Sequence, residues 1–230
     1  MLTYGYPKVH GRRNVVYEFG SNIALGVKES VDAYIGTTWG HFYFAVPGVL
    51  WAAGIDDFYA RTARLRLPFA LVGAGAIFVF AWIAMPVFRE APRRGLLFAA
   101  LFVMLSAGSV SLVLHLRELR YYPLVVCEVG VILLLHSRRM VFEMGRDDVR
   151  GQLRYGLAGA SLLVLLFHTF YAAYFLVVAL LGSHALLVAL RVRSQSERRR
   201  FLARGFLPTL LSAVLVVPSA IFFEIGRAHV

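Results

Sequence analysis

The amino-acid sequence predicts an all-α protein, a polytopic bundle of transmembrane helices that follows an N-terminal extracytoplasmic loop carrying interfacial helices. Of the 230 residues, 59% are hydrophobic and 16% are charged, whereas soluble domains have roughly 45–50% apolar and ~25% charged residues. Apolar segments long enough to cross a bilayer, which takes about 20 residues, alternate with short loops rich in arginine. The single cysteine, Cys127, excludes a disulfide within the chain.

The N-terminal region, residues 1–66, is expected to be the extracytoplasmic loop. Its first twenty residues lack the apolar core of a signal peptide. An aromatic-rich run, Thr37–Ile55, follows, and its composition is typical of a helix lying in the membrane interface. A seventh span is the alternative interpretation of this run.

Residues 67–223 are expected to form a bundle of about six transmembrane helices. The segment Tyr155–Leu190 is too long for one span, and we expect it to break near His168–Tyr171. Pro208 and Pro218 are tolerated in the last span, because neighbouring helices can satisfy the carbonyls that a proline leaves free. The segments that supply the spans are Leu67–Phe88, Gly95–Leu114, Tyr121–Leu135, Tyr155–Leu190 (counted twice) and Phe206–Phe223.

The distribution of basic residues predicts the orientation of these spans in the cytoplasmic (inner) membrane. Arginines concentrate in alternate loops, which the positive-inside rule places in the cytoplasm. The turns near residues 115–122 and 168–171 and the N-terminal region then face the extracytoplasmic side. Orientation accounts for the net charge of +11 without a nucleic-acid partner. The arginines of the predicted cytoplasmic loops are Arg89, Arg93, Arg94, Arg138, Arg139, Arg146, Arg150, Arg154, Arg191, Arg193, Arg198, Arg199, Arg200 and Arg204.

The stretch His115–Leu124, between two predicted spans, is the candidate binding site. Arg117 and Arg120 are three residues apart, so on a helical turn they share one face, with Glu118 beside them. Two guanidinium groups at a membrane surface can hold a phosphate, because each planar fork donates two hydrogen bonds at once. An ordinary polar loop with interfacial anchors is the alternative interpretation.

Further candidates for substrate contact lie on the same predicted side of the membrane. Interfacial aromatic belts have a similar composition, which is the alternative interpretation of these side chains. The additional candidate residues are His41, Tyr43, His115, Tyr121, Tyr122 and His168. Glu128, an acid inside a predicted span, is either functional or part of a polar contact between helices.

Three stretches in this order resemble a known family. They are the aromatic run WGHFYFAVPGVLWAAGI with the DDFYARTA that follows it, the span entry RLPFALVGA (Arg66–Ala74) and the turn RELRYYPL (Arg117–Leu124). Together they resemble the GT-C superfamily of membrane glycosyltransferases, in the branch of aminoarabinose transferases, protein mannosyltransferases and rhizobial lipopolysaccharide-core sugar transferases. The resemblance covers about Met1–Leu190. Leu119 stands where the family has a small residue.

The resemblance implies inverting transfer of a sugar from a polyprenyl-phosphate-linked donor to a lipid, glycan or protein acceptor. Basic residues then hold the lipid phosphate, sometimes with a divalent metal, and an acid of the first external loop acts as the base. The family's acidic pair and first span would lie ahead of Met1. Glu18, Glu29 and Asp32 remain as candidate acids, and solvated loop acids are the alternative interpretation.

The two ends of the chain predict an incomplete gene. EIGRAHV (224–230) can be encoded by the start of a common sequencing adapter, so we expect this tail to be non-native. The fragment is expected to be inactive alone, because the catalytic acid would be missing. Two alternatives to a glycosyltransferase stay open: a non-catalytic multi-pass protein, such as a transporter component or scaffold, and a polymerase or ligase of lipid-linked oligosaccharides.

Overall fold

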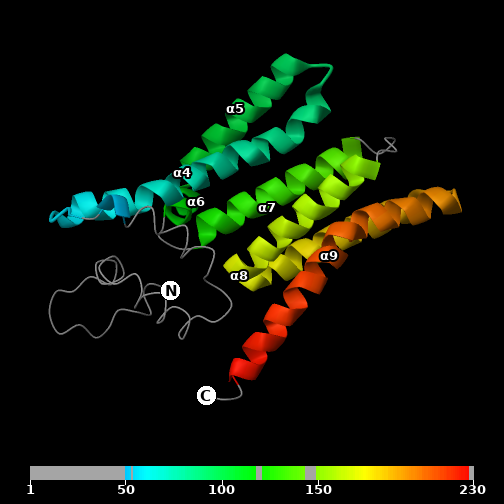
Figure 1. The fold of residues 1–230 in the computed structure, drawn as a ribbon. Helices are drawn as coiled ribbons and strands as arrows, with labels where there is room; N and C mark the ends of the chain where they lie inside the picture. The colour runs from blue at the N-terminus through cyan, green and yellow to red at the C-terminus, as the bar shows by residue number, and fades with distance from the viewer. Residues whose placement is uncertain (1–49, 53, 118–120, 143–148, 228–230) are drawn as a thin grey trace.

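The computed structural model describes residues 50–52, 54–117, 121–142 and 149–227, and all regular structure in these ranges is helical (Figure 1). The all-α prediction is therefore confirmed for the described part of the chain. The helices are α4 (Phe58–Ala84), α5 (Pro92–Gly108), α6 (Val110–Leu116), α7 (Tyr122–Ser137), α8 (Val149–Arg191) and α9 (Gln195–Arg227), with a 3-10 turn η1 (Met85–Phe88) and a π-helical turn η2 (Arg138–Phe142).

Helix α4 contains most of the first predicted span, Leu67–Phe88, and begins well before it, while η1 covers the last four residues of the span. The Asp57 carboxylate caps its first turn by accepting a hydrogen bond of 2.6 Å from the Ala60 amide. The Arg61 guanidinium donates to the Ile55 carbonyl and closes the preceding turn onto the helix. Pro86 then favours the tighter η1 turn at the far end.

The second predicted span, Gly95–Leu114, is not one continuous helix. Helix α5 ends at Gly108, and α6 starts at Val110 and runs at 82° to it. Ser109 between them has an extended backbone, with φ −77° and ψ 97°. Glycine and serine are poor helix formers, so Gly108 and Ser109 are a natural place for this bend. The expectation of one straight helix is corrected to a bent pair.

Helix α8 is a hairpin of two antiparallel halves. Phe170 interrupts it with φ −160° and ψ 97°, inside the predicted break at His168–Tyr171. The His136 ring on α7 lies 2.9 Å from the Tyr155 hydroxyl and 2.9 Å from the His184 ring. A straight helix would separate Tyr155 from His184 by about 44 Å, at ~1.5 Å per residue. Both can reach His136 only because the chain reverses at Phe170, as Figure 1 shows.

Close packing of small residues joins the α8 hairpin to α9. A Cβ atom at Gly205 would lie 2.6 Å from the Ala185 Cβ atom, and one at Gly159 would lie 2.9 Å from the Pro208 side chain. Such residues let helix backbones approach closely, which is how helices associate in a membrane. One buried cluster unites α7, both halves of α8 and α9: Ile132, Leu163, Leu166, Phe167, Ala173, Tyr174, Val177, Leu181 and Val216.

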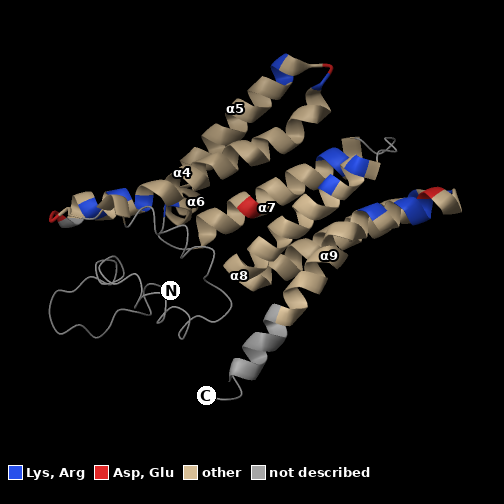
Figure 2. Cartoon of the chain, viewed as in Figure 1, with Lys and Arg blue, Asp and Glu red and all other residues tan. Residues whose placement is uncertain are grey.

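Most basic side chains of the helices gather at one end of the bundle, and a smaller group lies at the start of α4 (Figure 2). This arginine-rich end comprises η1 with the start of α5, η2 with the start of α8, and the junction of α8 with α9. The outer turn, whose described residues are 115–117 and 121–122, lies at the opposite end together with the break in α8 at Phe170.

Three helices in the described ranges are long and apolar enough to cross a membrane, namely Tyr59–Phe88, Val149–Arg191 and Gln195–Pro218. The bent pair of α5 and α6 makes a fourth if it counts as one span. Large apolar side chains also project outward, such as Leu105 at 76% exposed and Leu176 at 73%. Contiguous apolar surface of this kind suits contact with lipid.

Replacing Gly205 by alanine is expected to destabilise the bundle, because the added methyl group forces α8 and α9 apart at Ala185. The expected loss in the free energy of unfolding is about 1–3 kcal/mol. Gly75→Ala is the matched control: its Cβ atom would meet nothing within 4 Å, and alanine favours a helix by up to ~1 kcal/mol. Thermal unfolding in detergent measures the stability of both variants. Equal stability of the two variants would contradict the close contact.

Candidate functional site

The structure describes five of the residues that the sequence singles out as substrate contacts: His115, Arg117, Tyr121, Tyr122 and His168. Their placement can therefore be compared with the prediction. The other predicted contacts and the candidate acids lie outside the described residues, namely Glu18, Glu29, Asp32, His41, Tyr43, Glu118 and Arg120.

The first half of the outer turn is anchored on α4. Leu116 at the end of α6 is buried, and a Cβ atom on Gly73 of α4 would lie 2.7 Å from both its Cβ atom and its carbonyl oxygen. Only a glycine permits this approach. Arg117 follows directly, with an exposed side chain and a backbone amide that donates to the Leu114 carbonyl at 3.4 Å. The guanidinium group is thus presented at the surface from a fixed backbone.

The second half of the outer turn is anchored on α8 through aromatic rings. The ring centroids of Tyr121 and Phe170 are 4.6 Å apart and nearly parallel, at 19°. Tyr122 lies 4.5 Å from Tyr121 and meets the His115 ring edge-on at 5.2 Å. Ring pairs of this geometry contribute roughly 0.5–1.5 kcal/mol each beyond their burial. The Tyr121–Phe170 contact therefore brings the start of α7 against the break in α8.

Within this turn of α8, Phe170 rather than His168 stacks on the outer turn. His168 is partly buried and packs edge-on against Phe167 of its own helix, with centroids 5.4 Å apart. Sequence reasoning missed Phe170, although the break at HTFY was the signal that could have found it. A residue that reverses a helix at the same level as a neighbouring turn is well placed to contact that turn.

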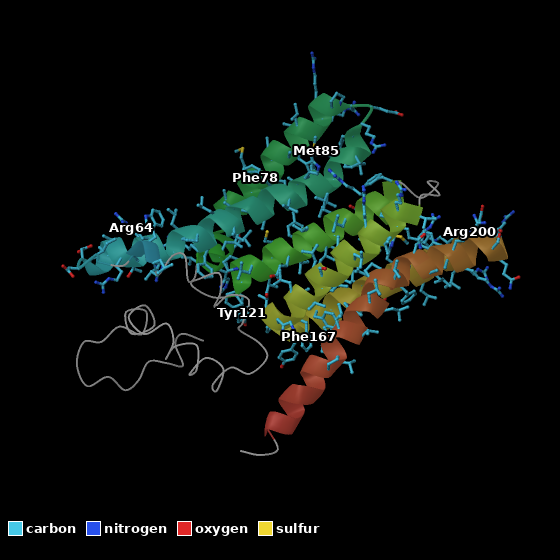
Figure 3. The ribbon with its side chains drawn as sticks, in the orientation of Figure 1. Arg64, Phe78, Met85, Tyr121, Phe167 and Arg200 are labelled. Atoms are coloured by element: carbon cyan, nitrogen blue, oxygen red, sulfur yellow. The ribbon has the colours of Figure 1, made fainter. Side chains whose placement is uncertain are left out.

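The start of α4 carries a second group of arginines at the same end of the bundle. Figure 3 shows Arg64 and Tyr121 toward one end and Met85 and Arg200 toward the other. The Arg64 guanidinium carbon lies 5.6 Å from the centre of the Trp51 ring, within cation–π range. Arg66 is exposed directly before the apolar stretch that begins at Leu67. These groups suit the polar edge of a membrane.

Buried polar contacts connect α7 with both halves of the α8 hairpin. Glu128 and Thr169 are 8% and 0% exposed, and their side-chain oxygens lie 2.9 Å apart. Glu128 therefore makes the polar helix–helix contact that the sequence leaves open. The cluster His136–Tyr155–His184 sits nearer the arginine-rich end. Sequence reasoning missed it, because its members are far apart along the chain and none of them belongs to a motif.

The chemistry at the outer turn is that of an anion site next to apolar helices. Arg117 supplies a permanent positive charge, and the side chains of His115, Tyr121 and Tyr122 supply polar hydrogens. Within the described ranges, no group of three or more His, Cys, Asp or Glu side chains is placed to hold a metal ion. The divalent metal of the sequence-based expectation therefore has no ligand set in this part of the protein.

The Tyr121–Phe170 stack is expected to hold the outer turn on α8. Phe170→Ala should lower the free energy of unfolding by at least the roughly 0.5–1.5 kcal/mol of one ring pair. Phe78→Ala is the control, since the Phe78 side chain is 60% exposed, and it should change stability by less than about 0.5 kcal/mol. Chemical unfolding followed by tyrosine and tryptophan fluorescence measures both. A Phe170 effect no larger than that of Phe78 would contradict the anchoring role.

No family model, no curated protein and no solved structure matches this chain.

Proposed function

We propose that this protein is a multi-pass enzyme of the cytoplasmic membrane that transfers a sugar from a polyprenyl-phosphate-linked donor on the extracytoplasmic face. The acceptor is a lipid, a glycan or a protein. The main support is the meeting of the outer turn and the Phe170 reversal at the end of the bundle opposite the arginine-rich loops. The resemblance to the GT-C superfamily supplies the reaction.

The proposed topology has six crossings. Helices α4 and α7, the two halves of α8, and α9 each supply one, and the bent pair of α5 and α6 supplies another. With the arginine-rich end in the cytoplasm, as the positive-inside rule requires, the outer turn faces the extracytoplasmic side. Nucleotide sugars are cytoplasmic, so a lipid-linked donor is the form of sugar expected there.

The proposed role of the outer turn is to hold the donor's phosphate. Arg117, together with Arg120 from the sequence, would donate charge-assisted hydrogen bonds to it. The same contacts would stabilise the negative charge that develops on the phosphate when it leaves the sugar. The polyprenyl chain would lie in the bilayer against exposed apolar side chains such as Leu101 and Leu105 of α5. The general base would be an acid of the first external loop.

Arg117→Ala is expected to weaken binding of undecaprenyl phosphate by about tenfold, or ~1.4 kcal/mol, since one charged hydrogen-bond donor is lost. Native mass spectrometry of the protein in nanodiscs can measure this. Binding is the chosen readout because it does not depend on the base. Arg93→Ala is the matched control, because Arg93 is equally exposed but lies at the arginine-rich end. Undecaprenol, which lacks the phosphate, should bind equally to all three proteins.

An unchanged affinity in Arg117→Ala, or an equal loss in Arg93→Ala, would reject the phosphate site at the outer turn. The scaffold interpretation predicts that unchanged result. Uptake of a solute into vesicles, abolished by Arg117→Ala, would instead favour a transporter component.

The proposed orientation predicts opposite labelling of two cysteines introduced into a Cys127→Ser background. Arg117→Cys should react with a membrane-impermeant maleimide added to intact spheroplasts. Ser194→Cys, which is exposed between α8 and α9, should react only after the membrane is permeabilised. The reverse pattern would place the outer turn in the cytoplasm and remove the support for a polyprenyl-linked donor.

A further inference from the structure

The Glu128 carboxyl group is buried among apolar residues, and one of its two oxygens has no partner. Oε1 lies 2.9 Å from the Thr169 hydroxyl oxygen, whereas Oε2 is buried without a hydrogen bond. Val125 and Val129, close to it along α7, and Leu166, one turn before Thr169 on α8, belong to or pack against the buried apolar cluster of the bundle. An isolated carboxylate pays a large desolvation penalty in such a place. The ionised form of Glu128 is therefore unfavourable, because its Oε2 atom would carry negative charge without a hydrogen-bond donor.

The Thr169 hydroxyl group decides which atom carries the proton. Its oxygen lies 2.9 Å from Glu128 Oε1 and also 2.9 Å from the Leu165 carbonyl oxygen one turn earlier. A hydroxyl has one hydrogen, so it can donate to only one of these two acceptors. Both contacts are hydrogen bonds at once only if the carboxyl group donates to Thr169 and Thr169 donates to Leu165.

We propose that Glu128 and Thr169 form a buried proton-binding site, in which the Glu128 carboxyl group is held as the neutral acid and donates to the Thr169 hydroxyl. The ligand is a proton, because a buried Oε2 atom leaves no room for a larger cation. This inference is independent of the proposed sugar transfer. It assigns Glu128 a binding role that needs neither a phosphate nor an acceptor.

The described stretches 69–84 of α4, 122–137 of α7 and 155–185 of α8 contain no Asp, Glu, Lys or Arg besides Glu128. Cys127 is its titratable neighbour on α7, and α8 contributes His168 and Tyr174 at nearby levels. The stretches 69–84 of α4 and 205–218 of α9 contain no titratable residue. A proton therefore neutralises Glu128 more readily than an ion pair could.

The site is linked to the outer turn through the helix reversal. Thr169 precedes Phe170, and Phe170 stacks on Tyr121.

The test is infrared difference spectroscopy of the full chain in lipid nanodiscs at neutral pH. The carbonyl band of a protonated carboxyl group is expected in the wild type and lost in Glu128→Gln. Glu90→Gln is the matched control: this carboxyl group is exposed, so its removal should leave the band of the buried acid unchanged. Thr169→Val should keep the band and shift it to higher frequency, because the acid loses its acceptor. A wild-type band identical to that of Glu128→Gln would overturn the proposal.

A second measurement covers the case in which Glu128→Gln does not fold. Dicyclohexylcarbodiimide adds across a protonated carboxyl group: the proton goes to a carbodiimide nitrogen, and the carboxyl oxygen bonds to the central carbon. The adduct then rearranges to a stable N-acylurea that peptide mass spectrometry can locate. Labelling of Glu128 without labelling of Glu90 supports the site. Labelling of Glu90 alone, or of neither residue, overturns it.

Discussion

The reversal of α8 at Phe170 is the constraint on which the rest of the bundle depends. In a lipid environment a chain can turn back only where its backbone groups are satisfied or where water is near, so the reversal must sit at an end of the bundle. Because it does, the two halves of α8 run side by side and form one surface for α9. The same reversal brings Tyr155 and His184 to opposite sides of a single imidazole on α7.

Packing in this protein combines small residues with a few buried polar pairs. Glycines set the spacing of α8 and α9, whereas hydrogen bonds mark the level at which α7 meets each half of the hairpin. In lipid, apolar contacts alone do little to fix how one helix is rotated or shifted against another. Lipid tails are as apolar as leucine, so an apolar side chain gains little by facing a helix instead of lipid. The hydroxyl oxygens of Tyr174 on α8 and Ser212 on α9 lie 3.3 Å apart and similarly fix the level at which these two helices meet.

Much of this arrangement could be predicted from the sequence, because hydropathy and arginine placement report on the membrane directly. The helices, the break near His168–Tyr171 and the separation of the two ends all follow from those signals. The bend at Ser109 could not be predicted, since Gly-Ser pairs also occur in straight membrane helices. Contacts such as Tyr121–Phe170 depend on how helices pair and rotate, which a single sequence does not encode in its periodicity. For the outer turn, the polar residues that are present could be predicted, but the residues that they contact could not.

The length of α7 has a consequence for the membrane itself. With its 16 residues, α7 is only about 24 Å long, less than the roughly 30 Å thickness of a bilayer core. Its neighbours α4 and α8 pack against it on two sides (Figure 1), so part of this hydrophobic mismatch is shielded from lipid. The π-helical turn η2 continues α7 and carries the buried Arg139. With α7 crossing the membrane as proposed, the protein would be a thinner barrier there than the bilayer around it, so sensitivity to lipid chain length should concentrate at α7.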